Sequence, residues 1–123
     1  MQGSGTYRYA GGSIYMGDFE DGMKSGEGTM TFADGSSYTG SYRNDMMNGE
    51  GRYTWPSGDS YVGQFTDNMR QGTGTYTWAN GETYVGEFEN NKMQGYGVYT
   101  WPSGRTYSGY FENGSILLVE TGS

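Results

Sequence analysis

The chain of 123 residues contains no cysteine and no histidine, and its only two leucines are adjacent, Leu117 and Leu118. Without thiol or imidazole groups it cannot form disulfides, cysteine or histidine metal sites, or a catalytic triad that needs histidine. The scarcity of leucine, together with 24 glycines, excludes a helical bundle with a conventional aliphatic core. We therefore expect no metal, no cofactor and no enzyme in this segment.

Positive charge and long apolar runs are also scarce. Seven basic residues stand against 14 acidic ones, which gives a net charge of −7. This balance argues against nucleic-acid partners and against binding to anionic membrane lipid. The longest apolar run, residues 116–119, is far shorter than the ~20 residues of a membrane helix. No signal peptide or transmembrane segment is seen, so a cytoplasmic protein is expected.

Glycine and aromatic residues are abundant instead, and they recur with a fixed period of 23 residues. Each unit reads Tyr-x-Gly-x-aromatic, then Gly-x-Gly, then an aromatic residue, then a turn triplet such as Pro56-Ser57-Gly58. The tyrosines that begin the units are Tyr15, Tyr38, Tyr61, Tyr84 and Tyr107. An exact period without insertions indicates a repeat protein.

The period divides the chain into one array without a second domain. We expect a partial repeat at 1–14, full repeats at 15–37, 38–60, 61–83 and 84–106, a partial repeat at 107–114, and a non-repeat cap at 115–123. The two partial repeats leave open whether the sequence begins inside a longer array or the protein has its true start mid-repeat. The aliphatic end segment is expected to add a final strand, to cover the terminal rings, or to dock into a second chain.

Alternation with period two predicts strands throughout. Tyr61, Gly63 and Phe65 share one parity, and Thr, Trp and Tyr are typical strand residues. Each unit is then two strands, giving about ten strands in all. The Pro56–Gly58 triplet predicts a three-residue loop with glycine in the left-handed region, and Asp67-Asn68 a second turn whose residues tolerate positive φ.

The two turns together predict a register. If Trp55 pairs with Asp59, Tyr53 faces Tyr61 and Gly51 faces Gly63. Pairing Phe65 with Gly72 across the other turn sets Gly63 opposite Gly74 and Tyr61 opposite Tyr76. One face of the sheet then carries rows of Tyr, Gly, Phe and Trp, while the other carries Thr, Ser, Glu, Arg and Val and is mostly wet.

Glycine lets large rings lie flat over the neighbouring backbone, because it has no Cβ. Rings laid over glycine rows then replace an aliphatic core. The structural glycines expected for this role are Gly40, Gly51, Gly63, Gly74, Gly86 and Gly97.

The unit Y-x-G-x-[FY], G-x-G, T-[FW]-x-x-G resembles the MORN repeat (membrane occupation and recognition nexus) over residues 3–114. The resemblance implies an all-β, elongated, single-layer antiparallel meander of stacked hairpins, twisted, with a shallow trough of aromatic residues and glycine. It also implies a scaffold rather than an enzyme, with a partner peptide or helix held in the trough, and homodimers in some members. This chain has Phe or Tyr where the family often has Trp in the first strand.

We therefore expect a non-catalytic scaffold that binds a peptide or protein segment along its aromatic face. For any single ring, a role as core competes with a role in binding, because a sheet without these rings has nothing to bury. The groove candidates are Tyr38, Tyr61, Tyr84, Phe65, Phe88, Trp55, Trp78 and Trp101.

Three alternatives stay open at this point. Choline- or carbohydrate-binding wall repeats are also rich in Gly, Tyr and Trp, although their Gly-Trp and Trp-Tyr-Tyr signatures are missing. A second alternative is that the chain is a structural spacer associated with phospholipid. A homodimer could form through an open edge strand at 5–9 or through the C-terminal segment.

Overall fold

The computed structural model describes residues 3–116, which form only strands and turns. The strands are β1 (Gly3–Arg8), β2 (Ile14–Glu20), β3 (Met23–Thr31), β4 (Ser37–Arg43), β5 (Met46–Thr54), β6 (Ser60–Thr66), β7 (Met69–Thr77), β8 (Thr83–Glu89), β9 (Lys92–Thr100), β10 (Thr106–Glu112) and β11 (Ser115–Ile116). They form one antiparallel sheet in chain order. The predicted all-β meander is therefore confirmed.

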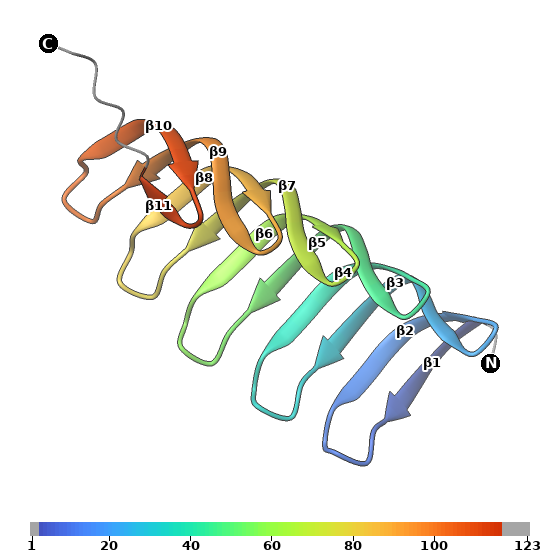
Figure 1. Cartoon of the computed structure of the whole chain (residues 1–123). Helices are drawn as coiled ribbons and strands as arrows, with labels where there is room; N and C mark the ends of the chain where they lie inside the picture. Colours follow the sequence, from blue (N-terminus) through green and yellow to red (C-terminus); the bar gives the residue numbers. More distant parts are fainter. Residues whose placement is uncertain (1–2, 117–123) are drawn as a thin grey trace, which may run out of the picture.

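The hairpins follow one another along a single axis, and the strands arch so that the sheet curves across its width (Figure 1). Every strand contacts its neighbours in sequence, because the strand order in the sheet is the order in the chain. This is the arrangement of a repeat protein, in which stability is the sum of contacts between adjacent units.

The three-residue loops have the predicted geometry. Trp55 N–H donates to the Asp59 carbonyl at 2.9 Å, and Gly58 N–H donates to the Trp55 carbonyl at 3.0 Å. Gly58 has a φ of 100°, in the left-handed region that favours glycine. The loop sets Tyr53 opposite Tyr61 and Gly51 opposite Gly63, as the sequence predicts.

The opposite ends of the hairpins carry two-residue turns. Asp67 and Asn68 have φ values of 47° and 72°, and the equivalent turns at 44–45 and 90–91 are alike. Both central residues at positive φ define the type I′ turn, which matches the twist of the flanking strands. This prediction from the Asp and Asn residues is also confirmed.

One predicted pair is wrong. Phe65 pairs with Arg70 and not with Gly72, although Gly63 does face Gly74. The tight turn places Thr66 opposite Met69, so residues 71–73 must bulge opposite Gln64 to restore the glycine register. The same shift recurs in the β2–β3, β4–β5 and β8–β9 hairpins.

Polar groups at the bulge are satisfied locally. Gly72 adopts a φ of 91° there. The Gln64 side-chain oxygen accepts from Thr73 N–H at 2.9 Å, and the Gln64 carbonyl accepts from the Tyr61 hydroxyl at 2.9 Å. Each bulge is thereby tied to the buried tyrosine of its own repeat, since the tyrosines at 15, 38 and 84 make the same bond.

The core is a single layer of rings over glycine. Tyr61 is fully buried, and a Cβ added to Gly74 would overlap its ring. A Cβ on Gly63 would lie 2.5 Å from the Cα of Gly74. The same contacts recur at the glycine pairs 40/51 and 86/97. Glycine is required at these positions because any side chain would displace a core ring.

The core rings form a zigzag that we call the inner aromatic row: Tyr15, Phe19, Tyr38, Tyr42, Tyr61, Phe65, Tyr84, Phe88, Tyr107 and Phe111, of which all but the partly buried Tyr107 are buried. Neighbouring rings meet edge to face, with centroids 4.8 Å apart at Tyr84–Phe111 and 5.6 Å apart at Tyr107–Phe111. Such pairs each add about 0.5–1.5 kcal/mol beyond area burial. The row therefore continues without a break from one repeat to the next.

At the C-terminal end, β11 pairs with β10, with Ile116 opposite Phe111. Ser115 and Ile116 thus follow the Asn113-Gly114 turn as Lys92 and Met93 follow theirs. The rest of the expected cap, 117–123, lies outside the described residues.

Candidate functional site

The structure places five of the eight groove candidates in the core. Tyr38, Tyr61 and Tyr84 have no exposed surface, and Phe65 and Phe88 are each 4% exposed. Their rings are enclosed because the arched sheet packs each against the rings of the adjacent repeats. They support the trough from below and present no surface to a partner in this conformation.

The three tryptophans behave differently, since Trp55, Trp78 and Trp101 are only half-buried. They belong to a second line of rings, which we call the outer aromatic row: Phe32, Tyr53, Trp55, Tyr76, Trp78, Tyr99 and Trp101. All but Trp101 pack against the core, and Trp101 packs against Tyr99. Centroids lie 4.6 Å apart at Tyr76–Trp78 and 5.2 Å apart at Trp78–Tyr99. The outer row is therefore a continuous aromatic strip with one side open to solvent.

Carboxylates accept hydrogen bonds from two of the three tyrosines of this row. The Tyr76 hydroxyl donates to Asp59 at 2.9 Å, and the Tyr99 hydroxyl donates to Glu82 at 2.8 Å. Burial raises the pKa of each phenol to about 12, and the hydrogen-bonded carboxylate adds to the rise. Both hydroxyls remain protonated donors at neutral pH, so these rings are held in place before any partner arrives.

A further set of side chains on the aromatic face was missed by the sequence analysis. The residue that pairs with the inner-row aromatic across each two-residue turn is Lys24, Met47, Arg70 or Met93 in successive repeats. The sequence predicts arginine on the wet face only as a residue type, without a position for Arg70, which the two-residue turn sets opposite Phe65. The alternation of basic residue and methionine is visible in the sequence, yet it has meaning only once the register is known.

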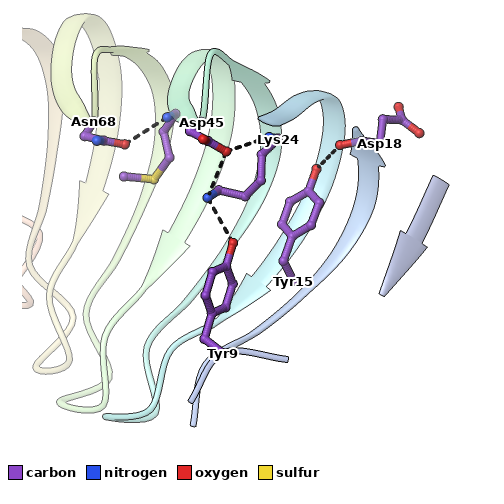
Figure 2. Close-up of polar contacts among 7 residues, drawn as sticks. Tyr9, Tyr15, Asp18, Lys24, Asp45 and Asn68 are labelled. Atoms are coloured by element: carbon purple, nitrogen blue, oxygen red, sulfur yellow. Dashed lines mark hydrogen bonds and ion pairs between the residues drawn. The ribbon is translucent and has the colours of Figure 1, made fainter. Parts of the chain in front are cut away.

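Lys24 is neutralised within the chain (Figure 2). Its ammonium lies 3.4 Å from an Asp45 carboxylate oxygen and donates to the Tyr9 hydroxyl at 3.2 Å. The same Asp45 oxygen accepts from the Lys24 backbone N–H at 2.6 Å. The ammonium also lies 5.5 Å from the centroid of the Tyr9 ring. Lys24 is therefore a paired cation with its charge balanced by Asp45.

Arg70 has no such carboxylate. Its guanidinium carbon lies 5.3 Å from the ring centroids of both Trp55 and Tyr76. Where Lys24 has Asp45, Arg70 has Asn91, whose backbone carbonyl accepts from Nη2 at 2.6 Å and whose side-chain oxygen accepts from the Arg70 N–H at 2.8 Å. The buried Nε has no hydrogen-bond acceptor among the described residues.

Burial among the rings lowers the pKa of the Arg70 guanidinium from its ordinary value, and the nearby Tyr76 phenol partly offsets this. Arginine still carries its charge at neutral pH. Within residues 3–116 the guanidinium makes no ion pair. The aromatic face thus contains one desolvated, uncompensated positive charge in an otherwise acidic protein.

Two hollows open on this face, one on each side of Arg70. The first, of about 230 Å³, is lined by Arg70 with Tyr53, Trp55 and Asn68 among others. The second, of about 210 Å³, is lined by Arg70, Trp78 and Lys92 among others. Both combine an aromatic wall with a cation, which suits binding rather than bond-making chemistry.

Among the described residues there is neither a metal site nor a membrane-spanning helix. No three acidic side chains cluster in a way that could hold a metal ion in the described part of the chain. Residues 3–116 contain no helix that could cross a membrane.

The family model described as the MORN repeat matches five consecutive segments, residues 1–14, 15–37, 38–60, 61–83 and 84–104. A search of curated protein sequences gives no match. Among solved structures, the chain is similar to the TCP domain of SAS-4 (dCPAP) of Drosophila melanogaster, solved in complex with a proline-rich motif of Ana2 (dSTIL). That likeness has 12% identity and a TM-score of 0.35, covers 85% of this chain and 76% of the other, and is too weak to imply a shared function.

Proposed function

Since the chain belongs to the MORN repeat family, whose non-enzymatic repeats generally mediate protein or membrane interactions, we propose that it is a scaffold that binds a polypeptide segment along the outer aromatic row. Tyr38, Tyr61, Tyr84, Phe65 and Phe88 act as the support beneath that row. Trp55, Trp78 and Trp101 act as contact residues.

The observation that carries this proposal is the half-exposed state of a continuous ring strip. A row of seven aromatic side chains, from Phe32 to Trp101, stays partly exposed although six of the rings pack against the buried core and Trp101 packs against Tyr99. Tryptophan and tyrosine dominate binding energy at protein interfaces, because they bury a large area with few rotatable bonds. An apolar strip of this extent marks an interaction surface more often than a bare monomer surface.

Polypeptide is favoured over anionic lipid by charge. The net charge of −7 repels an anionic bilayer, and the basic side chains in the trough are few. The strip is linear and as narrow as one line of rings, which suits an extended segment or one face of a helix.

The test is a binding measurement with a peptide selected from a random library displayed on phage, using the full chain as bait. We expect Trp78→Ala to weaken binding by about 2 kcal/mol or more, as for interface hot spots. Val85→Ser is the matched control, because Val85 is exposed on the opposite face and 52% accessible. Circular dichroism checks that both variants keep the wild-type fold.

Equal binding by wild type and a folded Trp78→Ala variant would contradict the proposal. The carbohydrate reading is tested in the same way, since stacking of sugars on the exposed tryptophans would change their fluorescence. Saturable quenching by oligosaccharides or choline, without any selected peptide, would favour that alternative.

A further inference from the structure

We propose that the hollow between Arg70, Trp78 and Lys92 is an anion subsite that takes the side-chain carboxylate of an aspartate or glutamate in the bound segment. This rests on the proposed function and adds the chemistry of the partner. The segment would lay apolar side chains on the outer aromatic row and one acidic side chain beside Arg70.

The comparison with Lys24 carries the inference. Lys24 and Arg70 occupy equivalent positions two repeats apart. Each cation contacts the face of an aromatic ring, Tyr9 for Lys24 and Trp55 for Arg70. The chain supplies Asp45 to the first and the neutral Asn91 to the second. The position that balances the cation is therefore the same in both repeats, and only at Arg70 is the balancing charge missing.

The polar groups around Arg70 leave room for an acceptor. Nη2 is bonded to the Asn91 carbonyl at 2.6 Å, whereas the buried Nε has no acceptor. Arg70 lines the hollow, so the oxygen of a ligand held there would lie against the guanidinium. Carboxylate is the best match, because a hydrogen bond between two ionised groups is stronger than one between neutral groups.

Lys92 also lines this hollow, but its side chain alternates with that of Met93 and so belongs to the opposite face of the sheet, across from the exposed Glu89. Asp59, whose carboxylate accepts from the Tyr76 hydroxyl, makes no ion pair with Arg70 among the described residues. One water takes about 30 Å³, so a hollow of about 210 Å³ admits a carboxylate side chain with part of its backbone.

A side-chain carboxylate is favoured over a phosphorylated residue. Phosphopeptide sites use clusters of arginines against a nearly dianionic group, and this hollow has one arginine in a protein of net charge −7. One negative charge also balances the single positive charge of Arg70.

The chain offers well-matched variants. Arg70→Met places at this position the residue that already occupies it at Met47 and Met93, so the fold is expected to persist. Asn91→Asp reproduces the Asp45 arrangement and supplies an internal carboxylate to Arg70 while keeping its positive charge. Lys24→Met is the control, because it removes a trough cation that is already paired.

The experiment selects phage-displayed peptides on the wild-type full chain and measures their affinity, with Asp or Glu intact and changed to Asn or Gln. We expect acidic residues in the selected peptides and a loss of about tenfold or more on their neutralisation. Arg70→Met and Asn91→Asp should each abolish the difference between acidic and neutral peptides, and Lys24→Met should preserve it.

The outcomes separate the two proposals. Tight peptides without an acidic residue, or an unchanged acidic preference in folded Arg70→Met and Asn91→Asp, would overturn the subsite and leave the proposed function standing. No peptide binding at all, or binding only to phosphatidylserine vesicles, would overturn both. A stronger response to a phosphoserine peptide than to its glutamate counterpart would overturn the choice of carboxylate.

Discussion

At the scale of single residues, the fold depends on the absence of a Cβ in glycine. The rings of the inner aromatic row occupy the volume that a Cβ would take at the paired glycines, as at Gly74 beneath Tyr61. The ring, its hydroxyl and the bulge carbonyl of Gln64 form one unit, because the hydroxyl donates to that carbonyl at 2.9 Å. Loss of the glycine therefore disturbs both packing and a hydrogen bond.

Gly74→Ala tests this dependence. The added methyl would overlap the Tyr61 ring, and we expect a loss of about 3 kcal/mol of unfolding free energy, at the upper end of overpacking effects. Chemical denaturation followed by far-ultraviolet circular dichroism measures it. Gly11→Ala is the control, because nothing lies within 4 Å of a Cβ there. Equal stability of the two variants would contradict the ring-on-glycine core.

At the scale of the hairpin, the two turns differ in length and impose different registers on the strands. The two-residue turn pairs Thr66 with Met69, whereas the glycine rows require Gly63 opposite Gly74, and the bulge at 71–73 accommodates both. Positive φ at Gly72 makes the bulge possible. The two-residue turn, which pairs Thr66 with Met69, sets Arg70 opposite Phe65 on the aromatic face.

Asn68 tests the two-residue turn, because it contributes both a φ of 72° and a side-chain oxygen that accepts from Met47 N–H at 2.9 Å. Asn68→Gly keeps the backbone conformation and removes the hydrogen bond, and we expect a loss of about 1 kcal/mol. Asn68→Ala should lose about 1 kcal/mol more, since alanine disfavours the left-handed region. Thermal or urea unfolding of both variants separates the contributions, and equal stability of the two would argue against a role for positive φ.

Much of this element could be predicted from sequence. Period-two alternation and the Asp, Asn, Pro and Gly residues at the turns are local signals, so the strands, the three-residue loop and the positive φ of the second turn are predicted correctly. The bulge reconciles the registers that the two turns impose, and no single residue in the sequence indicates it. Arg70 could not be placed for the same reason, and the division into inner and outer rows depends on sheet curvature that no motif records.

At the scale of the whole molecule, the buried tyrosines make the free energy of unfolding fall at alkaline pH. Burial raises the pKa of Tyr15, Tyr61 and Tyr84 to about 12 in the folded state. Unfolded tyrosine ionises near pH ~10, so between these values the unfolded state holds fewer protons. Stability is therefore fully present below about pH 10 and falls as pH rises through the folded values.

We expect unfolding above about pH 10 to coincide with a rise in tyrosinate absorbance. The chain contains no histidine, so stability should change little across the neutral range. Paired circular dichroism and absorbance titrations measure both. Ionisation of all 13 tyrosines near pH ~10 with the fold intact would contradict buried inner-row phenols.

The whole array places its only three tryptophans, Trp55, Trp78 and Trp101, in the outer aromatic row, so their indole N–H signals report on the proposed contact surface. The most direct test is a ¹H–¹⁵N spectrum of the full chain with and without a selected peptide. The account predicts shifts of the Trp55 and Trp78 indole signals, while the backbone amides of Val62 and Val85 on the opposite face stay in place. Unmoved indole signals at saturating peptide, with shifts at Val62 and Val85 instead, would contradict it.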